Sequence, residues 1–478
     1  MNWETIIGLE IHVELDTKTK IFCHCPTTFG SPPNQNTCPV CLGLPGALPV
    51  LNEAVVAMAV KAGLALGCKI ETVNKMDRKN YFYPDSPKAY QISQHDMPIC
   101  TGGFVDIEGK KGKKKVSIHH IHIEEDAGKL LHDEDEPVSY IDYNRVGVPL
   151  IEIVSEADMR SPEEAVSYLK AVRSILQYAG VSDCRMEQGS LRCDGNISVR
   201  PYGQEHFNPK VELKNINSFK ELQKALEKEE KRQLELYSFN EGHKIVQETR
   251  RWDAAKGRTI SMRTKEDAHD YRYFPEPDVK PIFIEENLIR GIEKQLPELP
   301  AEKAERFTKS YGLTEKEVNI LVSEKALSEF YEEVVKAGAD PKVAANWVLG
   351  DLLRMLKEKE LSAENQPLKP GDLAELIQII QKGSISSTAG RDVFDEMVET
   401  GKEAHLIIEE KGLKQISNIE ELQTITEKVL KENPESVQDF KNGKKQAVGY
   451  LMGQVMKATK GQANPKVAKE MLENLLQD

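Results

Sequence analysis

Two stretches of alternating polar and apolar residues constrain this chain most, because side chains with a period of two point to opposite faces of a β-strand. The stretches are residues 7–14 and residues 116–125. Their polar positions are Glu10, His12 and Glu14 in the first, and His120, His122 and Glu124 in the second. Their apolar positions are Leu9, Ile11, Val13, Ile121 and Ile123. The pattern predicts two strands that pack on a core through one face and present carboxylates and imidazoles on the other.

Two interpretations of these polar faces are open at this point. Carboxylates mixed with imidazole, without sulfur, suit a hard divalent cation such as Mg²⁺ or Mn²⁺. The same alternation is typical of an antiparallel sheet with one face in solvent, and the strand pattern alone favours that second interpretation. The choice between the two depends on the rest of the chain.

The chain has 478 residues and a formal net charge of −13, and this length suggests about three domains, each able to bury its own core. The first residues lack the basic start of a signal peptide, and the most apolar run, residues 54–66, is too short to span a bilayer. We therefore expect a cytoplasmic protein without a membrane segment. Because the chain is acidic, any contact with nucleic acid requires a local basic surface.

Four of the eight cysteines lie close together near the N-terminus, as the pairs Cys23 with Cys25 and Cys38 with Cys41. Two close thiol pairs joined by a loop predict a tetrahedral Zn²⁺ site, because each pair can chelate the metal from one tight turn. Four thiolates leave no open position, so this zinc would be structural. The alternative is four reduced, free cysteines.

Capping residues and glycines predict three helices in the first half of the chain: residues 54–66, Ser161 to Gly180, and Ser218 to about Tyr237. Residues 104–123 are typical of a hairpin with a lysine-rich turn. The loop of residues 77–94 is rich in aromatic residues and cations, so it can stack a base and hold a phosphate; by itself, an ordinary packed tyrosine loop is the favoured interpretation. Arginines crowd residues 250–272 and suggest a phosphate or carboxylate ligand.

Beyond a proline-rich boundary at residues 275–300, the strand signals vanish and capped helices continue to the end. Residues 441–469 contain seven lysines and no Asp or Glu. In an acidic chain this asymmetry indicates an RNA or DNA backbone as partner, with a merely solvated lysine face as the alternative. The candidate nucleic-acid contacts are Lys444, Lys445, Lys457 and Lys460.

Several common catalytic motifs are absent from the sequence. It contains no Gly-x-x-x-x-Gly-Lys-Ser/Thr loop and no Gly-x-Gly-x-x-Gly, so any nucleotide site would be of a less common kind. It also has no Gly-x-Ser-x-Gly elbow and no His-Glu-x-x-His pair. No side chain stands out as a nucleophile, and the residues by themselves name no reaction.

The whole chain nevertheless resembles the B subunit of the bacterial and organellar aspartyl/glutamyl-tRNA amidotransferase. The stretches that carry the resemblance are Gly8–Glu14, Cys38–Val50, Asp77–Pro84, Glu124–Lys129, Asp142–Pro149 and Asp270–Asp278. Residues 453–465 are similar to the small C-terminal domain of that family. With the resemblance we predict an α+β fold: an antiparallel-sheet-rich cradle domain with the zinc knot over residues 1–293, an all-α helical domain over 294–405, and a small all-α, tRNA-binding tail domain over 406–478.

The resemblance implies a heterotrimer, in which the other two members are the amidase/glutaminase, or A subunit, and the small C subunit. The B subunit would phosphorylate the side-chain carboxylate of Glu-tRNA(Gln) or Asp-tRNA(Asn) with ATP and amidate it with ammonia from the amidase. An acyl phosphate accepts ammonia without a covalent protein nucleophile, which agrees with the absent motifs. The alternative is a non-catalytic subunit for tRNA binding and assembly. A third interpretation, a free-standing metal-dependent hydrolase, has little support because a four-cysteine zinc site has no open position.

The resemblance also implies site residues. A Mg²⁺ pocket would use Glu10, His12, Glu124 and Glu125, although both neighbouring carboxylates can ligate only where the strand ends or bulges. Lys79 would be a further catalytic residue. Nucleotide or substrate contacts would come from Tyr81, Ser190, Arg192 and Asp194. The chain departs from the family pattern at Ala157 and Gln188, where proline and glutamate are more usual, so a role for position 188 is in doubt.

Overall fold

The computed structural model describes residues 2–109, 112–132, 136–264, 271–413, 419–441, 444, 446–459, 463 and 465–477. The chain divides into two compact units, Met1–Pro300 and Ala301–Asp478. Strands dominate the first unit and helices the second, which confirms the α+β fold class. The predicted division into three parts at residues 293 and 405 stays a prediction.

One large sheet forms the centre of the first unit. Its strands are β1 (Trp3–Glu14), β2 (Lys69–Ile70), β6 (Cys100–Thr101), β7 (Phe104–Gly109), β8 (Gly112–Glu125), β11 (Pro149–Ser155), β12 (Leu191–Pro201), β13 (Val211–Lys214), β14 (Glu248–Asp253) and β15 (Arg258–Thr264). They follow the order β15-β14-β13-β12-β1-β11-β8-β6-β2, with β7 paired to β8. The pairs are antiparallel apart from β13 with β14. The predicted strands at residues 7–14 and 116–125 and the β7–β8 hairpin are thereby confirmed.

Three smaller sheets complete the strands of this unit. They combine β3 (Val73–Asn74) with β17 (Ile282–Phe283); β4 (Asp77–Asn80) with β5 (Tyr90–Ser93) and β16 (Phe274–Pro275); and β9 (Lys129–His132) with β10 (Ser139–Asp142). Strand β5 packs beside β8 of the large sheet. The loop of residues 77–94 is therefore partly a β-hairpin, β4–β5, next to one predicted polar strand.

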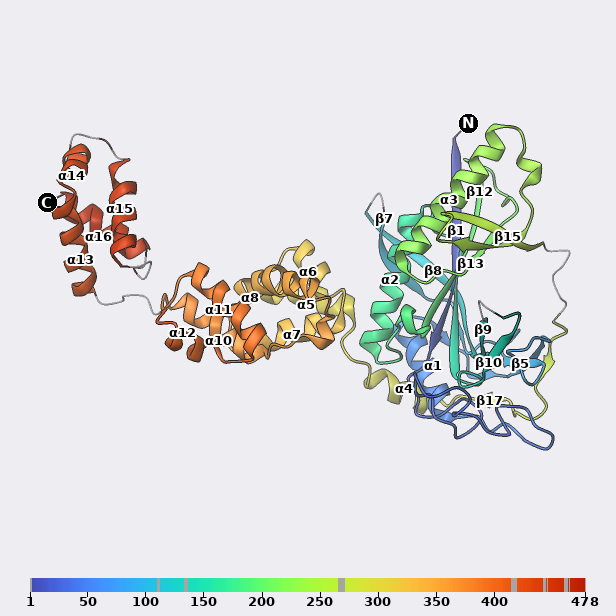
Figure 1. The fold of residues 1–478 in the computed structure, drawn as a ribbon. Coiled ribbons are helices and arrows are strands. Elements are labelled where there is room, and N and C mark those ends of the chain that lie inside the picture. The colour runs from blue at the N-terminus through green and yellow to red at the C-terminus, as the bar shows by residue number, and fades with distance from the viewer. Residues whose placement is uncertain are drawn as a thin grey trace. The chain divides into compact units, whose positions relative to one another are not determined.

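Helices α1 (Glu53–Ala65), α2 (Pro162–Ala179) and α3 (Phe219–Ser238) pack together on one face of the large sheet, and α4 (Glu286–Lys294) packs on α1 (Figure 1). The predicted caps are present, since Asn52, Ser161 and Ser218 each accept a hydrogen bond from the first turn of their helix. Two short 3₁₀ helices, η1 (Met186–Gln188) and η2 (Gly242–Lys244), lie in the connections. These helices cover the apolar face of the sheet and leave its polar face to the other side.

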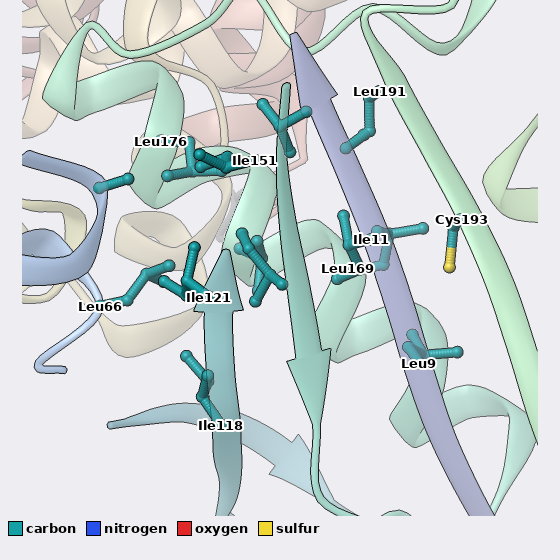
Figure 2. Close-up of a cluster of buried hydrophobic side chains, with 14 of the residues drawn as sticks. Leu9, Ile11, Leu66, Ile118, Ile121, Ile151, Leu169, Leu176, Leu191 and Cys193 are labelled. Carbon is teal, nitrogen blue, oxygen red and sulfur yellow. The ribbon is translucent and has the colours of Figure 1, made fainter. Parts of the chain in front are cut away.

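The main core lies between that sheet and its helices. Figure 2 shows Leu9 and Ile11 of β1, Ile121 of β8 and Ile151 of β11 turned towards Leu169 of α2. These five side chains are at most 1% exposed. The polar residues between them on the same strands must therefore point to the opposite face, because strand side chains alternate.

The second unit is helical throughout its described part. Its helices are α5 (Pro300–Tyr311), α6 (Glu315–Leu321), α7 (Lys325–Lys336), α8 (Pro341–Trp347), α9 (Leu353–Glu358), α10 (Pro370–Gln381), α11 (Ser387–Thr400), α12 (Ala404–Glu410), α13 (Ile419–Glu432), α14 (Pro434–Lys441), α15 (Ala447–Ala458) and α16 (Pro465–Gln477), with a π-helical turn, η4 (Val348–Leu352), and a 3₁₀ turn, η5 (Ala363–Asn365). The apolar side chains form one cluster from Phe307 to Ile408 and another from Leu422 to Leu476. Within the described ranges, no helix is long and apolar enough to cross a membrane.

Candidate active site on the polar sheet face

The polar residues of four adjacent strands form a continuous row across the sheet. In the register of the sheet, Glu10 on β1 lies opposite Asp194 on β12, and His12 lies opposite Glu152 on β11. Glu152 in turn lies opposite His122 on β8. Residues paired in this way across antiparallel strands are close neighbours on one face. The two strands predicted to carry ligands thus contribute to one polar surface, with β11 between them.

The first cluster in this row, which we call the His12 group, consists of His12, Glu124 and Glu152, whose ligand atoms all lie within 4.8 Å of one another. The His12 Nε2 atom is 3.5 Å from Glu124 Oε1 and 3.9 Å from Glu152 Oε2. Glu124 is only 4% exposed, so a solvent-facing sheet is the wrong interpretation for this part of the face. One imidazole and two carboxylates are a donor set that fits Mg²⁺ or Mn²⁺.

His122 balances part of the negative charge in the His12 group. Its Nε2 is 2.7 Å from Glu152 Oε2 and 3.6 Å from Glu124 Oε2. Burial alone would lower the pKa of His122, but the hydrogen bonds and charges of the two carboxylates raise it to about 9. Burial would likewise raise the pKa of Glu152, yet the hydrogen bond from His122 and the neighbouring cations hold it below its ordinary value. Both carboxylates are therefore ionised and ready to bind a cation at neutral pH.

Lys79 on β4 brings a second positive charge to this group. Burial lowers the pKa of its ammonium, but the charges of Glu124 and the nearby tyrosines and Glu152 raise it above the ordinary value. The ammonium lies 4.9 Å from the centre of the Tyr271 ring. Among the residues that the structure describes, no hydrogen bond or ion pair of the Lys79 side chain is found. Lys79 is therefore a charged group without an acceptor of its own, beside a candidate cation site.

The second cluster, the Glu10 group, consists of Glu10, Asp194 and Glu212, again with ligand atoms within 4.8 Å of one another. Here a lysine of the chain supplies the positive charge: the Lys214 Nζ atom is 2.5 Å from Asp194 Oδ2 and 2.9 Å from Glu212 Oε1. Asn196 donates a hydrogen bond of 2.8 Å to Glu10 Oε1. Burial, followed by the charge of Glu152, raises the pKa of Glu10. By distance, Glu10 thus lies with Asp194 and Glu212, while the charge of Glu152 in the His12 group still affects its pKa.

Glu125, the other predicted Mg²⁺ ligand, has different partners. Its carboxylate forms a buried ion pair with Lys88 and accepts a 2.8 Å hydrogen bond from the Ile92 backbone. Glu125 is 3% exposed and lines a small cavity, together with Lys88 and Cys41. The strand β8 ends at Glu125, as required if both carboxylates were to ligate, but Glu125 is not part of the His12 group.

The predicted nucleotide and substrate residues are distributed around this face. Tyr81 stacks on Tyr83 with ring centres 5.8 Å apart, beside Lys79 in the chain. Arg192 pairs with Asp126 at 2.9 Å, next to the end of β8. Ser190 accepts a hydrogen bond of 2.8 Å from the Arg185 backbone and so caps a turn.

Arg250, in the arginine-rich segment, is used inside the fold. Arg250 pairs with Glu248 at 2.7 Å and lies 3.5 Å from Glu229, which is fully buried. Its guanidinium is therefore committed to a structural ion network between α3 and β14. This partnership argues against Arg250 as a ligand-binding residue.

The four N-terminal cysteines are brought together as expected from their spacing. Their sulfur atoms lie within 4.8 Å of one another, in the set Cys23, Cys25, Cys38 and Cys41. Two sulfurs of a regular tetrahedral zinc site, with Zn–S bonds of about 2.3 Å, lie about 3.8 Å apart, and Cys38 and Cys41 Sγ are 3.9 Å apart. A hydrogen bond with Cys23, helped by the charge of Lys20, keeps the pKa of the Cys41 thiol well below its ordinary value despite burial. The distances between the four sulfur atoms fit Zn²⁺.

The basic tail is described only in part. Lys457 on α15 and Lys444 before it are exposed, and Lys444 pairs with Asp439 at 2.9 Å. The other two predicted contacts, Lys445 and Lys460, lie outside the described residues. Val455 and Leu451 are fully buried in the tail core, so these apolar positions of the helix face inward.

Sequence reasoning missed several residues of the polar face, above all Glu152, Glu212 and Lys214. Glu152 is the one charged residue in the mostly apolar strand Pro149–Ser155, and an isolated charge in such a run is a signal that could have revealed it. Lys214 and Glu212 alternate with the buried Leu213 and Val211 in β13. The sequence pattern could have predicted strands β11 and β13, but only the strand order and register show which residues lie beside them.

Comparison with known proteins shows the family to which the chain belongs. The sequence model of the GatB/GatE catalytic domain matches residues 5–290, and that of the GatB domain matches residues 329–476. The second B subunit of the aspartyl/glutamyl-tRNA(Asn/Gln) amidotransferase of Clostridium acetobutylicum is 60% identical over 478 residues, which is 100% of both chains. The corresponding B subunits of Clostridium beijerinckii and Thermoanaerobacter pseudethanolicus are 60% and 55% identical, again over 100% of each chain. The chain belongs to the family of the amidotransferase B subunit.

The match to this family covers both polar groups and the cysteine knot. Residues 5–290, matched by a domain described as catalytic, include every residue of the His12 group and of the Glu10 group. The match of residues 329–476 includes Lys444 and Lys457. The resemblance of the sequence motifs to the amidotransferase B subunit is therefore confirmed, and the non-catalytic alternative is not favoured.

Proposed function

We propose that this chain phosphorylates the side-chain carboxylate of Glu-tRNA(Gln) or Asp-tRNA(Asn) with ATP and then amidates it, using the polar sheet face as the site of both steps. Membership of the family makes the chain a subunit of a tRNA-dependent amidotransferase, a carbon–nitrogen ligase. The observation that carries the assignment of the site is the His12 group: ionised carboxylates beside an ammonium that has no acceptor of its own among the described residues.

In this proposal His12, Glu124 and Glu152 hold a Mg²⁺ ion, with Glu10 as their neighbour. When bound, the ion neutralises the charge of the ATP phosphates and of the phosphoryl group in transfer. Glu125 remains a predicted ligand, but its ion pair with Lys88 must open before it can serve. His122 keeps the two carboxylates of the group ionised and oriented through its hydrogen bonds.

The residues around the cation position the reacting groups. Lys79 stabilises the equatorial oxygens of the phosphoryl group as the substrate carboxylate oxygen attacks phosphorus and ADP leaves. Tyr81 offers a stacking surface beside it, while Arg192, Ser190 and Asp194 contact nucleotide or substrate. Ammonia then attacks the acyl phosphate carbon, phosphate leaves with the bonding electron pair, and a proton passes from nitrogen to a base.

The remaining proposals concern partners and metal. Ammonia comes from the amidase/glutaminase, the A subunit of a heterotrimer that also holds the small C subunit, since the sequence of this chain offers no obvious nucleophile of its own. The exposed lysines of the tail, Lys444 and Lys457, bind the tRNA backbone together with Lys445 and Lys460. Zn²⁺ at the four cysteines is structural. The complex works in the cytoplasm.

The test is transfer of labelled γ-phosphate from ATP to Glu-tRNA(Gln) by the reconstituted trimer, without an ammonia source. We expect acyl phosphate to accumulate with the wild type and to vanish with Glu124→Gln and His12→Ala, while tRNA binding is unchanged. Glu156→Gln is the matched control, because Glu156 follows β11 but is exposed. Normal phosphorylation by the Glu124 and His12 variants would refute the site. Loss of tRNA binding along with activity would support the assembly role instead.

A further inference from the structure

Lys20 is a lysine with an unusual environment, next to the cysteine knot. It is 0% exposed. Its ammonium donates a 2.7 Å hydrogen bond to the Asn36 carbonyl, lies 3.5 Å from the Tyr143 carbonyl and 3.9 Å from Cys41 Sγ. Fully buried lysines are rare, because an ammonium loses its hydration on burial and needs a negative partner in return. The charge that balances Lys20 therefore has to be identified.

The contacts of Lys20 leave one source of negative charge. The carbonyls of Asn36 and Tyr143 are uncharged dipoles, and in the described ranges no ion pair joins Lys20 to a carboxylate. Glu125 lines the same cavity as Lys20, but its carboxylate already pairs with Lys88. The remaining neighbour is the sulfur of Cys41. A Zn²⁺ ion with four thiolates carries a net charge of −2, which is itself costly to bury without a nearby cation. The positive charge of the Lys20 ammonium thus offsets part of the negative charge of the zinc-bound cysteine knot.

The backbone of the same residue contacts the other thiol pair. The Lys20 N–H donates a 2.9 Å hydrogen bond to the Cys25 carbonyl, while the side chain reaches Cys41. Gly147 packs beside this side chain: a Cβ at that position would lie at contact distance, 3.7 Å from Lys20 Cδ and Cys41 Cβ and 3.9 Å from Glu125 Oε2. Lys20 is therefore fixed between the two halves of the knot by its main chain, its side chain and the Asn36 carbonyl.

We propose that Lys20 is the counter-ion of a metal-bound tetrathiolate at Cys23, Cys25, Cys38 and Cys41, and that its charge sets the affinity of the knot for Zn²⁺. The inference rests on the proposed zinc site and adds a residue that tunes it. Partners of this kind around a metal site commonly change metal affinity by about 10- to 100-fold when they are replaced. The ammonium acts through the sulfurs and does not touch the metal, so Lys20 is a positioning and charge-balancing residue.

The experiment measures Zn²⁺ affinity of the full chain by competition with a chromophoric chelator. We expect Lys20→Met to weaken binding by about 10- to 100-fold and Lys20→Arg, which keeps the charge, to retain most of the affinity. Lys303→Met is the matched control, since Lys303 is also buried, at 7% exposure, but pairs with Glu332 in the helical unit. Equal affinities of wild type and Lys20→Met would overturn the proposal.

A second experiment, in a Cys25→His variant, separates the effect of the Lys20 charge from the effect of its side-chain shape. Cys25→His replaces one thiolate by a neutral ligand and lowers the charge of the metal complex from −2 to −1. If Lys20 acts by its charge, Lys20→Met costs less affinity in the Cys25→His background than in the wild type. An equal loss in both backgrounds would mean that Lys20 only holds the loops, and would overturn the proposal.

The same background covers the case in which Lys20→Met alone does not fold. Folding and zinc binding of the double variant would then support charge balance, and its failure would refute it. A wild-type chain that contains no zinc would instead refute the proposed zinc site itself.

Discussion

The His12 group and the Glu10 group lie side by side on one sheet face and have similar acidic content, but their charges are balanced differently. In the Glu10 group, the ammonium of Lys214 lies between two of the three carboxylates. In the His12 group, the imidazole of His12 and that of the adjacent His122 accompany the carboxylates, and the side chain of the nearby Lys79 has no acceptor among the described residues. An acidic cluster whose charge is balanced by a lysine of the chain can remain folded without a metal. An acidic cluster beside an ammonium that has no acceptor is suited to bind both a cation and a phosphate.

The largest expected effect is on Mn²⁺ affinity, and it tests whether the His12 group binds a cation that the Glu10 group does not. Glu152→Gln removes a ligand charge of the His12 group, and we expect Mn²⁺ affinity to fall by about 100-fold or more. The matched change Glu212→Gln, in the Glu10 group, should alter Mn²⁺ affinity by less than about threefold, because Lys214 already occupies that cluster. Calorimetric titration of the full chain with Mn²⁺ measures both. Equal losses in the two variants would show that both groups share one cation and would break the comparison.

The next effect concerns the two lysines. Lys79→Met should lower the rate of phosphoryl transfer to Glu-tRNA(Gln) by about 10²-fold, because a preorganised cation that faces the transferred group is lost. Its thermal midpoint should stay near that of the wild type, since no hydrogen bond or ion pair of the Lys79 side chain is found within the described residues. Single-turnover assays and thermal unfolding of the same preparations make the measurement. A stable variant with a normal rate would exclude Lys79 from the site.

Lys214→Met should show the opposite behaviour. It leaves Asp194 and Glu212 without their cation, which we expect to cost about 2 kcal/mol of unfolding free energy; the pair is partly exposed, so the loss stays below that of a fully buried one. Replacing the exposed Lys210 by Met is the control. The vacated cluster should also take up a second Mn²⁺ ion, visible as a change in stoichiometry. Unchanged stability together with a single Mn²⁺ ion would mean that Lys214 does not balance the Glu10 group.

The sequence determined more of the fold than of the site. The alternation in residues 7–14 and 116–125 predicts which face each side chain takes, since that depends only on the period of the strand. The choice of neighbours depends on register and strand order, which pair β1 with β11 and β12 across long sequence separations. For this reason the prediction joined Glu10 with His12, whereas Glu10 lies with Asp194 and Glu212. It also could not foresee that Lys88 would pair with Glu125.

The cysteine knot was the easier prediction, for a physical reason. Its ligands are close in sequence, and the two short pairs can approach without long-range pairing of strands. Lys20, by contrast, looks like any surface lysine in the sequence. Its burial against Cys41 follows from the packing of the loops around residues 36 and 143. Buried charges are thus the feature of this protein that a one-dimensional pattern predicts least well.

The smallest expected effect applies the same comparison to the basic tail. Lys444 pairs with Asp439, whereas no ion pair of Lys457 is found in the described part of the tail. A lysine that must leave a carboxylate before it meets a phosphate contributes less to binding, so Lys457→Gln should weaken tRNA binding by about threefold and Lys444→Gln by less. The salt dependence sharpens the test: Lys457→Gln should reduce the slope of log affinity against log salt by about one. Asp439→Asn should free Lys444 and strengthen binding, and if it leaves affinity and slope unchanged, the ion pair does not restrain Lys444 and the two lysines are equivalent.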